Sequence, residues 1–435
     1  MCGIIAAAST RNVGKLLVQG LHKMEYRGYD SAGIALHQHE SIAHLRALGK
    51  VQLLEDKMVA EKPKSKLGIA HTRWATHGEP SEANAHPHKS KDRVYIVHNG
   101  IIENYIELRE SLVKDGYEFS SQTDSELIAH LLDLYLNQGN CMIDAMYLAK
   151  KQLDGAYAIA AIDIENDASL VVARNKSPLL LGLGTDEILA ASDPLAIGQL
   201  TNEFIFLDDG DVAEISAETY TIFDADKKEV TREITNIDIS SQATSKGEFR
   251  HFMEKEIYEQ PEAILNTING RVGGDDVLDN IFGLGSTDLF KKVKRIQIVA
   301  CGTSLHAGRV AANWLSSISE LPCQIDYASE YRYRNPHVDE NSLLINISQS
   351  GETADTLAAL RYAKDNDYLG SVGICNVPTS SLARESDFVL FTNAGPEIGV
   401  ASTKAFTTQL AGLMLLALSI AKCKGVNPKL RTRVV

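Results

Sequence analysis

The chain has 435 residues, of which 44% are hydrophobic and 23% charged, and its formal net charge at pH 7 is −14. This length exceeds one ordinary hydrophobic core, so we expect two or three domains of a soluble globular protein. The acidic balance argues against nucleic acid as a main partner, because binding to a phosphate backbone needs a basic surface.

Residues 1–240 alternate short β-rich runs with amphipathic helical stretches, which indicates an α+β domain with mixed or antiparallel sheets covered by helices. Strands are predicted at 2–8, 32–36, 67–71, 94–98, 157–163 and 170–173, and helices at 13–24, 105–114, 125–136 and 143–152. Residues 195–215 are rich in strand formers. Thr123 and Asp124 are predicted to cap the helix that starts at 125.

A polar stretch at 240–246 and a charged helical segment at 247–264 assign residues 241–285 to a linker and connecting helices. Residues 286–425 alternate strands and helices and predict an α/β domain with a parallel sheet. Its strands are expected at 296–300, 324–327, 343–347, 372–375 and 388–391, and its helices at 305–319, 354–364 and 403–422. Residues 426–435 form a short tail.

The cysteine pattern and the apolar runs favour a cytoplasmic protein. None of the six cysteines forms a Cys-x-x-Cys pair, so neither a zinc site nor a disulfide framework is indicated. The N-terminus lacks the pattern of a signal peptide. The apolar run at 410–421 is shorter than the ~20 residues of a membrane-spanning helix, so we expect a buried helix and no membrane contact.

Cys2 directly follows the initiator methionine. If Met1 is removed, Cys2 carries both a thiol and an α-amino group, whose ordinary pKa values are about 8.5 and 7.7–8.0. The terminal amine can then act as general base for the thiol. An incidental cysteine near the terminus is the alternative, and the neighbouring motifs argue against it.

Polar residues at three other strand ends or helix starts complete a site for cleaving an amide. The Asn99 side chain and the Gly100 backbone N–H could stabilise an oxyanion, and losing one such donor typically costs ~2.7–4 kcal/mol. Arg73 suits the α-carboxylate of an amino acid substrate, and Asp124 suits its ammonium group.

Each of these residues also has a simpler interpretation. Arg73 could be a surface ion-pair partner, Asn99-Gly100 a hairpin turn, and Asp124 only a helix cap. His71, His77, His86 and His88 could suggest a metal site, but they lack carboxylate or cysteine neighbours, and no metal is expected.

The runs CGIIA, YRGYDSAGIA, HTRWATHG, NAHPH, VHNGIIENY and TDSELIAHLL resemble the glutaminase domain of the glutamine–fructose-6-phosphate aminotransferase (isomerising) family. This family belongs to the N-terminal-nucleophile (Ntn) hydrolases. The resemblance implies that Cys2 is the nucleophile and that Asn99 and Gly100 form the oxyanion hole. It further implies that glutamine is held by Arg73, Thr76, His77 and Asp124. By the same resemblance, Trp74 gates an ammonia channel, and Arg27 lies on a gating loop that shields the thioester formed between Cys2 and the substrate.

Three Ser/Thr-rich turns, at 301–304, 348–353 and 400–403, precede helices in the second half of the chain. Backbone N–H groups, hydroxyls and a helix N-terminus suit a phosphate monoester, whereas neither a nucleoside-triphosphate loop nor a dinucleotide motif is present. Simple helix capping is the alternative.

The runs SQSGETADTL and GVASTKAFTTQL resemble the first sugar isomerase (SIS) domain of the same family, which has a flavodoxin-like fold. The resemblance implies a sugar-phosphate site made of Thr303, Ser304, Ser348, Gln349, Ser350, Thr353, Val400 and Ser402. It also implies glutamine and fructose 6-phosphate as substrates, glucosamine 6-phosphate as product, no cofactor, and a homodimer formed through the isomerase half.

The family carries a second SIS domain and a C-terminal tail that find no match here, so we expect the synthase step to be impaired in this chain. A stand-alone glutaminase and a non-catalytic sugar-phosphate-binding fragment are the alternatives. A purine-pathway amidotransferase shares the N-terminal nucleophile, but it needs a phosphoribosyl-binding loop that SQSGET does not match.

Overall fold

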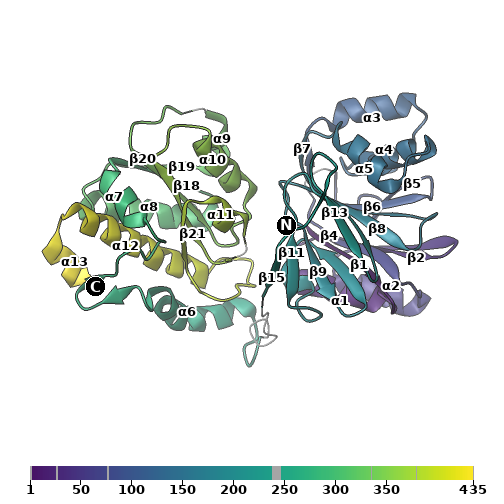
Figure 1. Ribbon diagram of the computed structural model, residues 1–435. Coiled ribbons are helices and arrows are strands. Elements are labelled where there is room, and N and C mark those ends of the chain that lie inside the picture. Colours follow the sequence, from purple (N-terminus) through teal and green to yellow (C-terminus); the bar gives the residue numbers. More distant parts are fainter. Residues whose placement is uncertain are drawn as a thin grey trace. The chain divides into compact units, whose positions relative to one another are not determined.

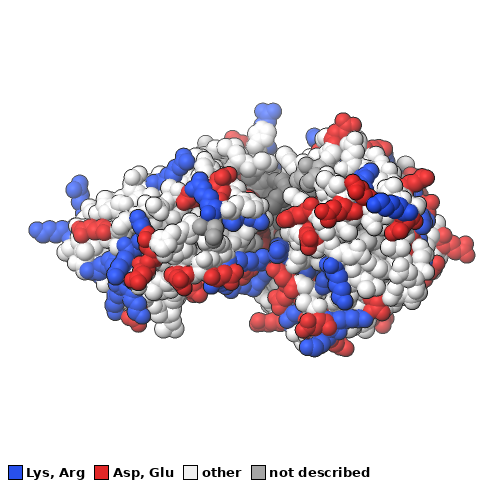
Figure 2. Space-filling view, turned by 90° about the horizontal axis from the view of Figure 1, so that it is seen from above, with Lys and Arg blue, Asp and Glu red and all other residues white. Residues whose placement is uncertain are grey.

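The computed structural model describes residues 2–25, 28–75, 78–237, 246–334, 336–378 and 380–434. The chain forms two compact units, residues 1–241 and 242–435, each with its own sheets and core (Figure 1). On the face seen in Figure 2, acidic and basic side chains are interspersed, as expected of a solvated surface.

Unit 1 contains an eight-stranded antiparallel sheet in the order β15-β11-β9-β10-β1-β4-β2-β3. Its strands are β1 (Gly3–Ser9), β2 (Ser31–Gln38), β3 (Ser41–Leu48), β4 (Leu67–Arg73), β9 (Leu180–Gly184), β10 (Glu187–Ala191), β11 (Glu203–Phe206) and β15 (Ile234–Asn236). Two helices, α1 (Gly14–Met24) and α2 (Val51–Glu61), pack against this sheet.

A second antiparallel sheet in unit 1 has seven strands in the order β14-β13-β12-β8-β7-β6-β5. These are β5 (His88–Ser90), β6 (Val94–Ile102), β7 (Gly155–Asp163), β8 (Ser169–Asn175), β12 (Val212–Ser216), β13 (Tyr220–Phe223) and β14 (Glu229–Val230). It is covered by α3 (Tyr105–Lys114), α4 (Glu126–Asn137) and α5 (Met142–Lys150). Elsewhere in unit 1, a short 3-10 helix spans Pro194–Ala196.

The alternation of side chains along the strands produces four layers in unit 1. On β1, Ile4 and Ala6 pack against the second sheet, whereas Ile5 and Ala7 pack against α1. This period of two is what a strand buried on both faces requires. The two sheets therefore lie face to face between two layers of helices, and the α+β prediction with antiparallel sheets is confirmed.

Unit 2 is built on a parallel sheet in the order β19-β18-β20-β21-β22. The strands are β18 (Arg295–Ala300), β19 (Cys323–Tyr327), β20 (Ser342–Ser348), β21 (Gly370–Cys375) and β22 (Phe388–Phe391). This order is the flavodoxin-like 2-1-3-4-5 arrangement, so the predicted flavodoxin-like α/β domain is confirmed.

Helices cover both faces of this sheet. One face packs on α7 (Ser286–Lys292), α8 (Gly302–Ile318) and α12 (Lys404–Lys424), and the other on α9 (Ala328–Arg334), α10 (Ala354–Lys364) and α11 (Ser381–Glu385). The remaining elements are α6 (Phe252–Ile268), the hairpin β16 (Val272–Gly273) and β17 (Asp276–Val277), and α13 (Pro428–Val434).

The apolar run at 410–421 lies within α12, close to the helix predicted at 403–422. Among the described residues, α12 is the one helix whose 21 residues are long and apolar enough to cross a membrane by length and composition. However, 61% of its apolar window is buried inside the protein, and it packs against α8 and α6 in the core of unit 2. The expected buried helix is therefore observed, although the argument from a short length was wrong.

Candidate functional site

The first candidate site lies at one end of the sandwich in unit 1. Ile4 on β1, Ile69 on β4 and Val97 on β6 all face the layer between the two sheets. Because alternate residues of a strand share a face, His71 and Asn99 point into the same layer, and Cys2 precedes β1 on that side. Three strands from two sheets thus bring Cys2 close to Asn99.

The Cys2 thiol sits against the backbone of Trp74. The Trp74 N–H donates to Cys2 Sγ at 3.2 Å, and the thiol lies 3.6 Å from the Trp74 carbonyl oxygen. Burial raises the pKa of this thiol, which the hydrogen bond from Trp74 and the charge of Arg73 only partly oppose. Because the protonated thiol is favoured, the nucleophile needs a base beside it.

Asn99 and Gly100 lie within β6, so the hairpin-turn alternative is wrong. The Asn99 side chain is buried, and its Nδ2 donates to the Cys2 carbonyl oxygen at 3.3 Å. Gly100 has a φ of +139°, and a Cβ there would lie 1.9 Å from the carbonyl oxygen of Ala156. Only glycine fits at this position, because neighbouring β7 runs too close for any side chain.

Arg73 ends β4 and is 4% exposed, so the surface ion-pair alternative is wrong. Its guanidinium donates to the carbonyl oxygens of Gly78 and Glu79 and lies 3.9 Å from a carboxylate oxygen of Asp30. Asp30 also accepts a hydrogen bond from the Ala75 N–H at 2.5 Å. The sequence reasoning missed Asp30 as a site residue, although it lies in the quoted YRGYDS motif.

Asp124 is buried, but it does not cap α4 as predicted. Its carboxylate accepts a hydrogen bond from the Ile102 N–H at 2.8 Å and lies 3.4 Å from the Ser125 hydroxyl. No side chain within the described ranges caps α4, whose N-cap residue is Ser125. The carboxylate therefore joins the end of β6 to the start of α4.

Trp74 is 51% exposed and lies next to Gly28, whose φ is +76°. A Cβ at Gly28 would come within 2.5 Å of the Trp74 indole, so the ring covers this turn. The other predicted site residues in this region, Arg27, Thr76 and His77, lie outside the described residues.

Three of the histidines considered for metal binding, His71, His86 and His88, are buried, and His77 lies outside the described residues. His71 stacks on His86 at 4.1 Å between ring centroids, and His86 contacts His88 edge-on at 4.5 Å. Burial lowers the pKa of His71 to about 3 and those of His86 and His88 well below the ordinary value. Over the residues that the structure covers, no cluster of His, Cys, Asp or Glu could hold a metal ion.

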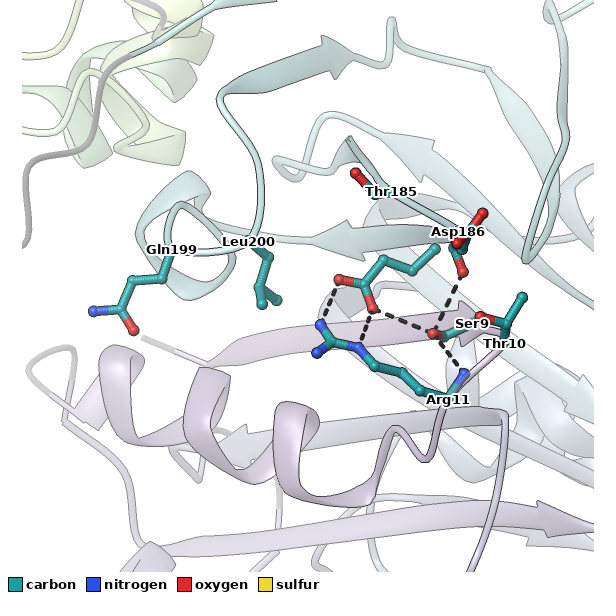
Figure 3. Close-up of a pocket in the computed structure, with 8 residues that line it drawn as sticks. Ser9, Thr10, Arg11, Thr185, Asp186, Gln199 and Leu200 are labelled. Atoms are coloured by element: carbon teal, nitrogen blue, oxygen red, sulfur yellow. Dashed lines mark hydrogen bonds and ion pairs between the residues drawn. The ribbon is translucent and has the colours of Figure 1, made fainter.

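A separate hollow of about 410 Å³ lies at the other end of β1 (Figure 3). Arg11 makes a bidentate ion pair with Glu187 across it, at 2.7 and 2.9 Å, and Ser9 also donates to Glu187. Ser9 is seven residues from Cys2, about 23 Å along an extended strand. The charged groups there bind one another, and the hollow is far from the thiol.

The second candidate site lies at the carboxyl edge of the parallel sheet in unit 2. Ala300 pairs with Ile347, so the turns that follow β18 and β20 leave the sheet side by side. The chain runs to opposite sides of the sheet from these two strands, into β19 and into β21, which makes this a topological switch point. Ligands bind at such points in open α/β sheets.

Hydroxyl groups gather at this switch point. Ser348 accepts a hydrogen bond from the Gly351 N–H at 3.0 Å and lies 3.0 Å from the Thr353 hydroxyl. Ser304 is buried in the first turn of α8 and receives a hydrogen bond from Gln409 of α12. Neither Ser304 nor Thr353 acts as a side-chain cap within the described chain, which weakens the simple capping alternative.

The remaining predicted residues of this site are more exposed. Thr303 lies on the surface of the first turn of α8, and Gln349 and Ser350 are half-buried in the turn after β20. Val400 is 82% exposed, and Ser402 donates to Glu397 at 3.2 Å. Ser402 and Val400 thus belong to the loop that enters α12.

Comparisons with known proteins cover both units. A glutamine amidotransferase domain model matches residues 71–199, and a SIS domain model matches residues 289–419. The glutamine–fructose-6-phosphate aminotransferase (isomerising) of Idiomarina loihiensis is 51% identical over 100% of this chain and 72% of that protein. The same enzyme from Pseudomonas putida is 53% identical over 98% of this chain and 70% of that protein.

Among solved structures, the C-terminal domain of glucosamine-fructose-6-phosphate aminotransferase from Francisella tularensis is 50% identical. The match covers 44% of this chain and 54% of that chain, with a TM-score of 0.43. The identity to full-length relatives, spread over both units, shows that this chain belongs to the glutamine–fructose-6-phosphate aminotransferase (isomerising) family.

Proposed function

We propose that unit 1 hydrolyses glutamine at Cys2 and that the ammonia condenses with the carbonyl group of fructose 6-phosphate, with loss of water, to an imine that isomerises to glucosamine 6-phosphate. The observation that carries this proposal is the contact between Asn99 and Cys2, at 3.3 Å, at the end of β1. Family membership supplies the substrates. The sugar phosphate would bind at the switch point of unit 2.

The glutaminase steps follow from the groups around Cys2. After removal of Met1, the α-amine takes the thiol proton, and the thiolate attacks the carboxamide carbon of glutamine. The carbonyl oxygen becomes an oxyanion that accepts hydrogen bonds from Asn99 Nδ2 and the Gly100 N–H. The C–N bond then breaks, ammonia leaves with the proton held by the amine, and a thioester remains. Water, activated by the same amine, releases glutamate and restores the thiol.

Several residues position glutamine in this proposal. Arg73 binds the α-carboxylate, which requires it to exchange a carbonyl partner in the 78–79 loop for the substrate. Asp124 faces the α-ammonium group, and Thr76 and His77, which follow Arg73 in the sequence, are proposed to contribute as well. Trp74 and Arg27 act as gates, and the packing of Trp74 on Gly28 supports the role of Trp74.

The sugar phosphate is held by Ser304, Ser348, Gln349, Ser350 and Thr353, and Thr303, Val400 and Ser402 line the sugar pocket. Backbone N–H groups at the start of α8 and the hydroxyl pair Ser348–Thr353 suit a phosphate monoester. The enzyme is proposed to act in the cytoplasm as a homodimer formed through the isomerase half.

Glutamate release by the purified chain tests the glutaminase assignment. Wild-type protein whose intact mass shows loss of Met1 is expected to release glutamate and ammonia, and Cys2→Ala is expected to release none above background. Cys141→Ala serves as a matched control, because Cys141 is an exposed cysteine at the start of α5. Equal turnover in the wild-type and Cys2→Ala proteins would refute the role of Cys2.

A further inference from the structure

His71 lies directly behind Asn99 in the layer between the two sheets of unit 1. It is fully buried on β4, opposite Ile4 of β1, and its Nε2 lies 2.9 Å from Asn99 Oδ1. The stacked ring of His86 holds the imidazole from one side. His71 is therefore held in place. It contacts the oxygen end of the Asn99 amide, whereas the nitrogen end of the amide faces Cys2.

The contact with Asn99 determines which nitrogen of the His71 imidazole carries the proton. Burial keeps the pKa of His71 near 3, so its imidazole is neutral at neutral pH. A carboxamide oxygen only accepts hydrogen bonds, so the contact requires the proton on Nε2 of His71. The amide nitrogen of Asn99 is then left to face Cys2, where it donates to the Cys2 carbonyl oxygen.

We propose that His71 is a positioning residue that holds the Asn99 amide with its N–H groups toward the oxyanion. This inference rests on the proposed glutaminase function. If the amide rotated by half a turn, Oδ1 would face the developing negative charge, and the interaction would change from attraction to repulsion. A neutral imidazole suits this task, since it donates one hydrogen bond without placing a second charge beside the thiol.

His71→Leu removes the donor and keeps an apolar side chain in the buried site. Loss of a whole oxyanion donor lowers kcat about 10²–10³-fold, and an Asn99 amide free to rotate should lose part of that. We expect kcat for glutamine hydrolysis to fall about 10- to 100-fold, with KM within about twofold. His71→Gln, whose amide can again donate to Asn99, is expected to recover most of kcat.

A double-mutant cycle separates positioning from general damage. If His71 acts through Asn99, His71→Leu should lower kcat in the wild-type background but cause no further loss in an Asn99→Ala background. Alkylation of Cys2 by iodoacetamide, read on the N-terminal peptide, should keep its wild-type rate, because that substitution forms no oxyanion.

His37→Leu is the matched control for loss of a buried imidazole. His37 is 4% exposed on neighbouring β2, and its Nε2 contacts the Ile164 carbonyl oxygen at 3.0 Å. It should lower the melting temperature as His71→Leu does but leave kcat unchanged. Additive losses in the cycle, or an unchanged kcat in folded His71→Leu, would overturn the inference, whereas an inactive wild-type protein would overturn the proposed function instead.

Discussion

The carboxylate of Glu256 on α6 accepts a hydrogen bond from the Gly399 N–H at 2.8 Å, and the same oxygen accepts one from the Ile398 N–H at 2.5 Å. Glu256 is 2% exposed, and burial raises its pKa. Gly399 lies one residue before Val400. The carboxylate on α6, more than 130 residues earlier in the chain, therefore fixes the start of the loop that contains Val400 and Ser402.

Replacing Glu256 by alanine should therefore disturb both stability and sugar-phosphate binding. The change leaves two partly buried backbone N–H groups without their acceptor. Each would cost about 1–3 kcal/mol if it were fully buried, so about 1–3 kcal/mol per group is the upper limit of the loss. We expect fructose 6-phosphate to raise the melting temperature of the wild-type chain. We expect Glu256→Ala to lower the free energy of unfolding of unit 2 and to abolish that rise. Differential scanning fluorimetry with and without the sugar measures both effects.

Glu262→Ala is the control for this experiment. Glu262 lies on the exposed face of the same helix, so its removal changes the charge equally without freeing a buried N–H. A wild-type shift by fructose 6-phosphate in Glu256→Ala would show that the loop does not depend on this carboxylate.

Gly100→Ala should affect the oxyanion site more than an ordinary glycine substitution does. The new Cβ would lie 1.9 Å from the Ala156 carbonyl oxygen, so β6 must move away from β7, and the Gly100 N–H moves with it. We expect at least about a 100-fold loss of kcat for glutamine hydrolysis, the scale of one lost oxyanion donor. Steady-state glutamate release measures this, and the loss should fall on kcat rather than on KM.

Gly116→Ala separates the strain of a positive φ from the collision. Gly116 has a φ of +87° and open space around its Cβ position, so this variant carries only the backbone cost, of order 1 kcal/mol. It should retain wild-type turnover with a slightly lower melting temperature. Near-normal kcat in Gly100→Ala would show that the strand pairing at this point is not required for catalysis.

Some elements were predicted with the bounds that the structure shows. The helices at 105–114 and 354–364 and the strand at 388–391 match the observed elements, and turn-forming residues such as Asp115 and Gly116 mark where the first of these helices ends. The missed elements have weaker patterns. On α2 only Val51 and Leu54 are buried, and on β3, at a sheet edge, only Leu45 and Ala47 are buried.

The candidate site was predictable in its residue types but not in its supporting contacts. Cys2, Asn99 and Gly100 stand in recognisable motifs, and their chemistry follows from their side chains. The contact between His71 and Asn99 joins strands of two different sheets, and local periodicity carries no information about such pairs. Asp124 shows the converse, since a residue with a good local role as a cap instead binds the backbone of β6.

The buried histidines predict that unit 1 loses stability as the pH falls. Burial lowers the pKa of His44 to about 4 and of His71 to about 3, against about 6.5 in an unfolded chain. Below pH 6.5 the unfolded chain therefore binds protons that the folded unit does not, so stability falls as pH decreases toward 4 and 3. At pH 5, 1.5 pH units below the unfolded value, the loss is about 2 kcal/mol for the fully buried His71.

Unit 2 provides the internal comparison for this pH dependence. Its histidines, His251, His306 and His337, are all exposed, and the raised pKa of Glu256 acts in the opposite direction, since the folded unit then gains a proton as pH falls. Urea unfolding at pH 7 and pH 5 can follow each unit separately, because Trp314→Phe leaves Trp74 as the reporter of unit 1 and Trp74→Phe leaves Trp314 as the reporter of unit 2. The urea midpoint of unit 1 should fall by more than that of unit 2 between these pH values. Equal shifts in both units would mean that the neutral imidazoles between the sheets do not control the acid sensitivity of unit 1.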